Sequence, residues 1–359
     1  MSVLSLPTGP LTACVLRDVA KGIKHSPAAA AVAMRQGFLV RLAAFVAPGA
    51  PAVDKKLRLW ALRTMWCLSK HVDAPYLSVA QPKILECVLA ALSDGAMDEE
   101  AYACLDAVRA CIDTDTGVGE FVVAGGIGVL RSVLMRTSCP PPVIWRALDC
   151  LVGLQNRRDY VPFLLLVIRA VYAAMAAHTG SVLVQLKAMQ LLAALANDDT
   201  AALVATQTAM DTVTAARVAM DKHDSKSIQQ YGCVVLGRLP GLLHVAVAAR
   251  VVIRAMNLAP ASCVTVRYGC TALYKVAKSA PGARKLMQLL CIKLVRGVLA
   301  RHHTCFAVQP RGNKLLAYLC DGPLDVPVDL DSDTDTASAS SWDESDAEAP
   351  APSKRVRRH

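Results

Sequence analysis

The sequence predicts an all-α solenoid, a stack of helices in which one structural unit repeats about seven times along the chain. The first observation behind this prediction is a recurring pattern, in which a small residue is followed by apolar residues four and seven positions later, as on one face of a helix. The second is composition, because 54% of the 359 residues are apolar and only 5% are aromatic. The core is therefore expected to consist of small aliphatic side chains.

The recurring pattern has a period of about 42 residues. We call its small residues the anchors, and they are Ala61, Cys104, Ala147, Ala188, Gly232, Gly269 and Gly312. Successive anchors lie 37 to 44 residues apart. A period of this length in a helical pattern indicates stacked helices rather than several globular domains.

Two anchors are glycines within the same tripeptide, Tyr-Gly-Cys, and both segments have a helical pattern. A glycine inside a helix costs roughly 1 kcal/mol relative to alanine. We therefore expect each anchor to lie where the last helix of a repeat crosses its neighbours, because a small residue there lets the backbones approach closely.

Several segments resemble the armadillo repeat family. Residues 120–130 (Glu-Phe-Val-Val-Ala-Gly-Gly-Ile-Gly-Val-Leu) are similar to that repeat's junction between its first and second helices, and residues 36–40 (Gln-Gly-Phe-Leu-Val) are a weaker copy. The segments that begin at Gly232 and Gly269 are similar to its third helix. The resemblance covers about residues 10–320. It implies a right-handed solenoid of about seven repeats with an N-terminal cap, and HEAT-like helix pairs where the junction glycine is missing.

A phosphate-binding loop at residues 124–128 is disfavoured, since the Lys-Ser/Thr of a P-loop and a strand–turn–helix context are both missing.

The family resemblance implies that the third helices hold an extended partner segment. In importin-α-like members, a Trp two residues after the anchor and an Asn six residues after it bind basic nuclear-import signals. The residues two after each anchor are here Arg63, Asp106, Asp149, Gln190, Val234, Thr271 and Lys314. The residues six after are Cys67, Ala110, Gly153, Ala194, Arg238, Lys275 and Tyr318. Neither set contains a Trp or an Asn, which disfavours an import-receptor function.

Charge is distributed unevenly along the chain, whose net charge is +10. Residues 225–320 contain 14 Lys and Arg and no Asp or Glu. We expect the last three repeats to present a positive surface to a negative partner. The candidate partner-binding residues on or near the inner face are Arg238, Arg267, Lys275 and Lys314. Other basic residues are expected on turns and outer helices, namely Lys278, Arg284, Lys285, Arg296 and Arg301.

Three negative partners fit this surface. The first is an acidic or phosphorylated segment of another protein, and the second is nucleic acid bound through its phosphates. The third is the chain's own acidic tail, which follows directly and would have a high effective concentration.

The tail, residues 321–359, is predicted to be a disordered acidic segment after a repeat domain over 1–320, because it contains 10 acidic residues and few apolar ones. Residues 327–333 resemble a SUMO-interacting motif, with candidate docking residues Val328, Leu330, Asp331 and Ser332. Ser332, Ser341 and Ser345 each have an acidic residue three positions on and are candidate phosphorylation sites. A candidate nuclear-import signal, which an importin would bind, consists of Lys354, Arg355, Arg357 and Arg358.

No set of residues has the spacing of a catalytic, cofactor or metal site. The thirteen cysteines lack zinc-binding spacing, and with no signal peptide evident they indicate a reducing compartment. Residues 161–177 are apolar but contain Arg169, so we expect a buried helix rather than a membrane span. The sequence thus predicts a monomeric, non-enzymatic, cofactor-free scaffold, nuclear or alternatively cytoplasmic, that binds an acidic or phosphorylated protein segment. The alternative is a sequence-independent nucleic-acid-binding protein.

Overall fold

The computed structural model describes residues 11–46, 54–71, 77–95, 98–154, 163, 166–196, 200–239, 245–279 and 281–321. These residues form helices and the turns between them, without a strand. In the first half the helices are α1 (Ala13–Lys24), α2 (Pro27–Arg35), α3 (Phe38–Val46), α4 (Lys55–Ser69), α5 (Leu77–Ser93), α6 (Asp98–Cys111), α7 (Asp115–Val123), α8 (Gly126–Leu134) and α9 (Pro141–Leu154). The later helices are α11 (Ile168–Ala177), α12 (Val182–Leu195), α13 (Thr200–Lys222), α14 (Lys226–Arg238), α15 (Val245–Leu258), α16 (Cys263–Ser279), α17 (Pro281–Arg301) and α18 (Gln309–Asp321).

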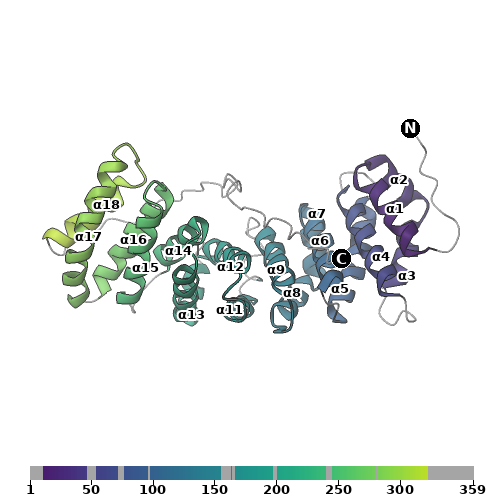
Figure 1. Cartoon of the computed structure of the whole chain (residues 1–359), viewed down its shortest axis with the longest axis horizontal. Coiled ribbons are helices and arrows are strands. Elements are labelled where there is room, and N and C mark those ends of the chain that lie inside the picture. The colour runs from purple at the N-terminus through teal and green to yellow at the C-terminus, as the bar shows by residue number, and fades with distance from the viewer. Residues whose placement is uncertain are drawn as a thin grey trace, which may run out of the picture. The chain divides into compact units, whose positions relative to one another are not determined.

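The helices form seven repeats after an N-terminal cap, as the sequence predicts. The cap is α1, which packs on α4. The last helices of the repeats are α4, α6, α9, α12, α14, α16 and α18, and each packs on the next in this series (Figure 1). All seven anchors lie on these helices and are buried. The architecture is therefore an α-solenoid.

The two predicted glycine junctions break helices where the sequence places them. Gly37 separates α2 from α3 with φ 66°, and Gly125 separates α7 from α8 with φ 75°. Only glycine adopts this left-handed conformation at little cost. The axes bend by 80° at Gly37 and by 73° at Gly125. Within the described residues, the last three repeats show no such glycine and form the helix pairs α13–α14, α15–α16 and α17–α18, as the HEAT-like prediction expects.

The glycine anchors are close-packed, but their neighbours differ from those we expected. A Cβ atom built on Gly232 would lie 2.2 Å from Sδ of Met220, and one on Gly269 would lie 2.7 Å from Sδ of Met256. These methionines belong to the preceding helix of the same repeat, so a side chain rather than a backbone occupies the space. The close backbone approach occurs instead at Gly237, whose Cβ would lie 2.8 Å from the Tyr268 carbonyl oxygen.

A glutamine closes the preceding helix in three repeats, and in two of them it is fully buried. Gln185, Gln229 and Gln309 each lie three residues before an anchor. The side-chain amide of Gln229 donates to the carbonyl oxygens of Met220 and His223, both at 2.7 Å. Gln185 and Gln309 make the equivalent pairs of hydrogen bonds at the ends of α11 and α17. The last carbonyls of a helix have no partner within it, so these amides satisfy them.

Histidines link the turns of successive repeats. Nε2 of His223 lies 2.9 Å from the Thr179 carbonyl oxygen, and Nε2 of His302 lies 2.9 Å from that of Pro260. Each histidine follows the first helix of its pair and reaches the equivalent turn of the repeat before. These contacts recur with the repeat and fix the spacing of adjacent turns.

The core is aliphatic, as predicted, and all thirteen cysteines are free thiols, of which nine are buried. Within the described residues, no single helix has both the length and the apolarity of a membrane span. The bent pairs α2–α3 and α7–α8 meet that criterion only when each pair is taken together. The apolar segment at 161–177 is described as α11 from Ile168 onward, and the buried side chains of α11 include Val171 and Ala174.

Candidate functional site

Polar side chains connect the last helices of successive repeats at equivalent positions. In each contact, one residue directly precedes the anchor of its own repeat. Its partner lies two residues after the anchor of the repeat before. Nη2 of Arg146 lies 2.5 Å from the Asp106 carboxylate, and Nζ of Lys187 lies 2.9 Å from that of Asp149. Further along, Gln190 donates to the Tyr231 hydroxyl at 3.2 Å and Arg311 to the Thr271 hydroxyl at 3.5 Å. We call these four pairs the inter-helix polar ladder.

In the N-terminal repeats, the ladder pairs cations with the carboxylates of Asp106 and Asp149, which each lie two residues after an anchor. Asp149 contacts Arg146 at 3.0 Å and Arg109 at 3.6 Å in addition to Lys187. Burial alone would raise the pKa of Asp149, but these three cations lower it below its ordinary value. Burial raises the pKa of Asp106 despite the opposing effect of Arg146. The two aspartates are thus structural ion-pair partners between helices.

Two of the predicted partner-binding residues lie around one tyrosine ring. Nη2 of Arg238 donates to the Tyr268 hydroxyl at 2.6 Å, and its guanidinium lies 4.9 Å from the ring centroid. The Arg267 guanidinium lies 5.3 Å from the same ring. Arg238 also donates to the Ala193 carbonyl oxygen at 3.2 Å, so it links three successive last helices. Burial lowers the pKa of Arg238, and the charges of Arg267 and Arg311 lower it further.

The other two predicted residues differ from each other in their surroundings. Nζ of Lys275 donates to the carbonyl oxygens of Arg238 and Leu239, at 3.2 and 3.1 Å, so it caps the C-terminal end of α14. Nζ of Lys314 lies 5.1 Å from the centroid of the Tyr274 ring. That ring also has Lys278 at 5.9 Å and packs edge-on against Tyr318, with centroids 5.5 Å apart.

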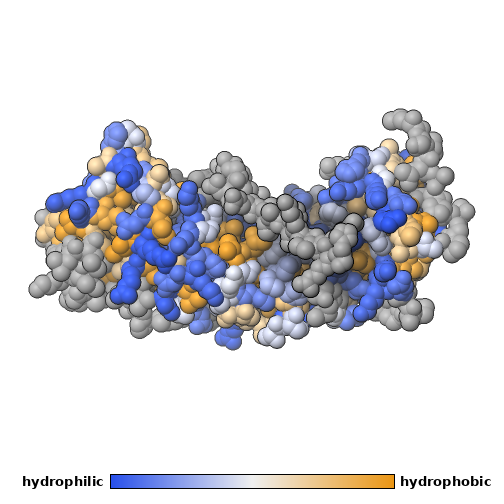
Figure 2. Space-filling model, in the orientation of Figure 1, coloured by the Kyte–Doolittle hydropathy of each residue, from blue (hydrophilic) through white to orange (hydrophobic). Residues whose placement is uncertain are grey.

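These contacts define one surface, which we call the tyrosine–cation ridge. It consists of Arg238, Arg267, Tyr268, Thr271, Tyr274, Lys275, Lys278, Arg311, Lys314 and Tyr318. Like charges crowd on this ridge. Burial lowers the pKa of Lys314, and the positive charges of Lys278 and Arg311 lower it further. On the face shown in Figure 2, hydrophilic and hydrophobic side chains alternate over α14 to α18.

The remaining basic residues of this region lie outside the ridge. Helix α17, the first helix of its pair, carries four of the basic residues expected on turns and outer helices, namely Arg284, Lys285, Arg296 and Arg301. The fifth, Lys278, lies on α16 and belongs to the ridge. Arg254 on α15 forms ion pairs with Asp224 at 2.5 Å and with Asp221 at 3.9 Å. Both aspartates precede residues 225–320, the stretch without acidic side chains. The candidate tail residues between Val328 and Arg358 lie outside the described residues.

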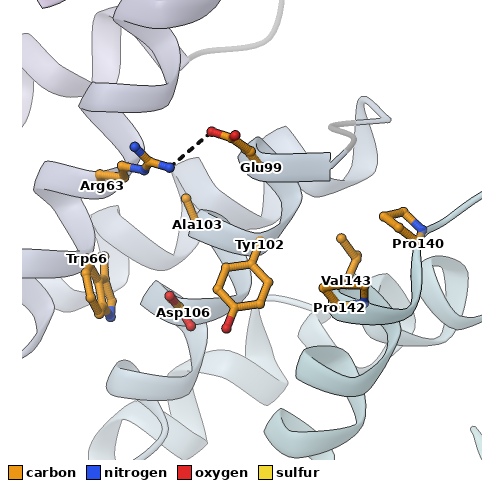
Figure 3. Close-up of a pocket in the computed structure, with 9 residues that line it drawn as sticks. All are labelled: Arg63, Trp66, Glu99, Tyr102, Ala103, Asp106, Pro140, Pro142 and Val143. Carbon is orange, nitrogen blue, oxygen red and sulfur yellow. Dashed lines mark hydrogen bonds and ion pairs between the residues drawn. The ribbon is translucent and has the colours of Figure 1, made fainter. Parts of the chain in front are cut away.

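A pocket of about 360 Å³ opens between α4, α6 and the start of α9. Figure 3 shows the Asp106 carboxylate between the rings of Trp66 and Tyr102, with the Arg63–Glu99 ion pair, 3.1 Å long, at the other side. Pro140, Pro142 and Val143 complete the lining together with Ala103. Its size and aromatic walls suit a single side chain of a bound segment.

This pocket was not predicted from the sequence, because tryptophan was expected only two residues after the anchors. Trp66 lies five residues after its anchor, whereas Tyr102 and Trp145 each lie two before theirs. The two latter rings meet edge-on with centroids 6.1 Å apart. The recurrence of an aromatic residue two before successive anchors was the available signal.

Within the described residues, no group of three or more His, Cys, Asp or Glu side chains is placed to hold a metal ion.

Comparisons with known proteins bear on the fold. No protein-family model matches the chain, and no curated protein matches it in sequence. A designed armadillo repeat protein, solved in complex with the peptide (KR)4, is similar in structure with a TM-score of 0.51 and 14% identity. That match covers 63% of this chain and 92% of the designed protein. An engineered protein matches with a TM-score of 0.53 and 16% identity, over 66% of this chain and 96% of its own. The seven-repeat α-solenoid described above thus has the armadillo-like fold that the sequence resemblance predicted.

Proposed function

We propose that this protein is a non-enzymatic scaffold that binds an acidic or phosphorylated protein segment along the tyrosine–cation ridge. The observation that carries the proposal is the arrangement of Arg238, Arg267, Lys278 and Lys314 around the rings of Tyr268 and Tyr274. The rings and the aliphatic parts of the cations offer apolar contact, while the ammonium and guanidinium groups attract negative charge.

The charge of the ridge determines the kind of segment we expect. The N-terminal ladder balances each aspartate with cations, whereas residues 225–320 contain no acidic side chain at all. Burial and then repulsion from Lys278 and Arg311 lower the pKa of Lys314, and a bound carboxylate or phosphate would offset that repulsion. Arginine also binds phosphate in a bidentate manner. An extended acidic segment therefore complements the ridge.

The structural neighbour supports peptide binding as the general mode. That designed armadillo repeat protein was solved with the peptide (KR)4, which is basic. The ridge of the present chain has the same sign of charge as that peptide, so we infer that the same kind of surface here accepts a segment of opposite charge.

The tail supplies further proposals that belong with this function. We propose that residues 321–359, with 10 acidic side chains, compete with the partner for the ridge. Phosphorylation of Ser332, Ser341 or Ser345 would add negative charge and strengthen that competition. We also propose that Val328 and Leu330 bind SUMO, and that the basic residues from Lys354 to Arg358 direct the protein to the nucleus through an importin.

Matched charge variants test the ridge. The ridge variant combines Arg267→Gln, Lys278→Gln and Lys314→Gln, and the control combines Lys293→Gln, Arg296→Gln and Arg301→Gln on α17. Both remove three charges from the acid-free stretch, and the control side chains are exposed. Binding of a fluorescent Asp- and phosphoserine-rich peptide at physiological salt would be measured by anisotropy. We expect the ridge variant to bind at least about tenfold more weakly, and the control within about threefold of wild type.

Three further results would distinguish ridge binding from binding by net charge, binding of nucleic acid and competition by the tail. Equal weakening in both variants would contradict the ridge as the site and indicate binding by net charge alone. Tight binding of random-sequence oligonucleotides at physiological salt, with a steep salt dependence, would favour the nucleic-acid alternative. Deletion of residues 321–359 is expected to strengthen peptide binding, and an unchanged affinity would contradict competition by the tail.

A further inference from the structure

Two cysteines and a histidine meet near the C-terminal end of the stack, apart from the ridge aromatics. Cys263 is the first residue of α16 and is exposed. Cys305 is half-buried in the turn between α17 and α18, and His302 directly follows α17. Sγ of Cys263 lies 3.4 Å from Nδ1 of His302. Most other thiols of the chain are enclosed in the aliphatic core, so this cluster differs in both exposure and polarity.

The hydrogen bonds of His302 fix its tautomer. Nε2 lies 2.9 Å from the Pro260 carbonyl oxygen, which can only accept a hydrogen bond. Nε2 therefore carries the proton, and Nδ1 presents a lone pair to the Cys263 thiol. His302 is 7% exposed and is held by the turn contact that spaces the repeats. Nδ1 of His302 is thus positioned to accept the proton of the Cys263 thiol.

The second thiol has surroundings that favour its thiolate. The backbone N–H of Cys305 donates to the His302 carbonyl oxygen at 3.0 Å, and the Cys263 thiol and the backbone N–H groups of Ala307 and Val308 act as donors on the pKa of Cys305. Burial alone would raise the pKa of Cys305, but these donors and the positive charge of Arg267 lower it. Burial raises the pKa of Cys263, and so does its contact with Cys305. Of the two sulfur atoms, that of Cys305 is therefore the more nucleophilic.

We propose that Cys305 and Cys263 form a peroxide-reactive dithiol that closes to an intramolecular disulfide. This site goes beyond the proposed function, because no partner segment takes part in it, although Arg267 belongs to the ridge as well. Both cysteines contact His302, Cys263 through its sulfur and Cys305 through its backbone N–H, which places the two thiols in one cluster. Dithiols of this kind in a reducing compartment are redox-sensing rather than permanently oxidised.

The reaction balances with one peroxide molecule. The Cys305 thiolate attacks a peroxide oxygen and the O–O bond breaks, so Cys305 becomes a sulfenic acid and the leaving hydroxide takes up a proton to form water. The Cys263 sulfur then attacks the Cys305 sulfur, which forms the S–S bond and breaks the S–O bond. Nδ1 of His302 accepts the Cys263 proton and passes it to the departing hydroxide, forming the second water. The two thiols lose two electrons and two protons, and the peroxide is reduced to two waters.

The full-length protein allows a direct test. Trypsin releases Cys263 on residues 255–267 and Cys305 on residues 302–311, each without another cysteine. After treatment with equimolar hydrogen peroxide, non-reducing peptide mapping by mass spectrometry should find these two peptides linked. The Cys305 thiol should also disappear at least about tenfold faster than the exposed thiol of Cys14. Absence of the linked peptide, or equal rates at Cys305 and Cys14, would overturn the proposal.

Variants assign the two sulfur atoms their separate steps. Cys263→Ser should leave a sulfenic acid on Cys305 that dimedone traps, and Cys305→Ser should slow oxidation of Cys263 to the rate of Cys14. The control Cys14→Ser should leave the yield of linked peptide unchanged. His302→Gln should prolong the dimedone-trappable stage, and closure at the wild-type rate in that variant would exclude His302 as the proton acceptor. Circular dichroism checks folding, and the wild-type mapping is decisive even if a variant misfolds.

Discussion

At the scale of single residues, Gln229 shows how one buried polar side chain closes a helix. It is fully buried, and its amide donates to the carbonyl oxygens of Met220 and His223 at the end of α13. Leucine has a similar volume but no donor, so both carbonyl groups would remain buried without a partner. We expect Gln229→Leu to lower the free energy of unfolding by about 1–3 kcal/mol, measured by urea denaturation.

The matched control is Gln36→Leu. Gln36 is exposed at the end of α2, so the same substitution there should change the free energy of unfolding by less than about 0.5 kcal/mol. Similar losses at both positions would show that the hydrogen bonds of Gln229 contribute little.

The sequence indicates these glutamines through their spacing from the anchors and not through their residue type. Gln185, Gln229 and Gln309 share one offset from the anchors, yet glutamine is usually exposed, so the burial of Gln185 and Gln229 is not expected from residue type. Gly37 and Gly125 were easier to predict, because a left-handed backbone conformation strongly selects glycine. The neighbours of Gly232 were not predictable, because contacts between helices depend on rotation about their axes, which the period does not specify.

At the scale of secondary-structure elements, Asp149 joins α9 to α12 and α6 through Lys187 and Arg109. Its pKa is lowered in the folded state, so its ionised form contributes stability that is fully present above the unfolded-state pKa, about 4, and is lost as pH falls through the lower folded-state value. We expect Asp149→Asn to lower the free energy of unfolding by about 1–3 kcal/mol at pH 7. This difference from wild type should shrink below about pH 4.

Asp106→Asn is the matched control, because Asp106 has the same position relative to its anchor and the opposite shift. Burial raises its pKa, so protonation of wild-type Asp106 relieves a cost of folding, and wild type should gain stability relative to Asp106→Asn as pH falls toward 4. The measurement is urea denaturation of the three proteins between pH 7 and pH 3. Parallel pH dependence of the two variants would contradict the assignment of these shifts.

The sequence could place Asp106 and Asp149 at equivalent positions but could not identify their partners. Arg146 and Lys187 lie one residue before the next anchors, a full repeat away, and only the stacking of the helices brings them within 2.5 and 2.9 Å. The same limit applies to the ridge. Its excess of positive charge was evident from the sequence, whereas the capping of α14 by Lys275 depends on how α16 crosses α14.

At the scale of the whole repeat domain, helix contacts connect neighbours along the chain. The last helix α14, for example, packs on α12, α13, α15 and α16. Stability in such a stack is approximately the sum of the intrinsic stabilities of the repeats and the interactions between adjacent ones. A substitution that weakens one repeat should therefore loosen its neighbours first, and the effect should fall off along the chain.

Gly232→Ala tests this expectation, with Gly297→Ala as its control. The added methyl group at Gly232 would collide with Met220, whereas a Cβ on Gly297, inside α17, meets nothing within 4 Å. We expect Gly232→Ala to cost about 1–3 kcal/mol through overpacking, and Gly297→Ala to stabilise α17 by up to about 1 kcal/mol through helix propensity.

Amide hydrogen exchange followed by mass spectrometry should show the loss of protection in Gly232→Ala concentrated in α12 to α16. Protection of the amides of α1 to α6 from exchange should be unchanged, because none of the helix pairs that pack extensively joins α14 to these helices. A uniform loss from α1 to α18 would instead mean that the described repeats unfold as one cooperative unit, and the additive picture of the stack would be wrong.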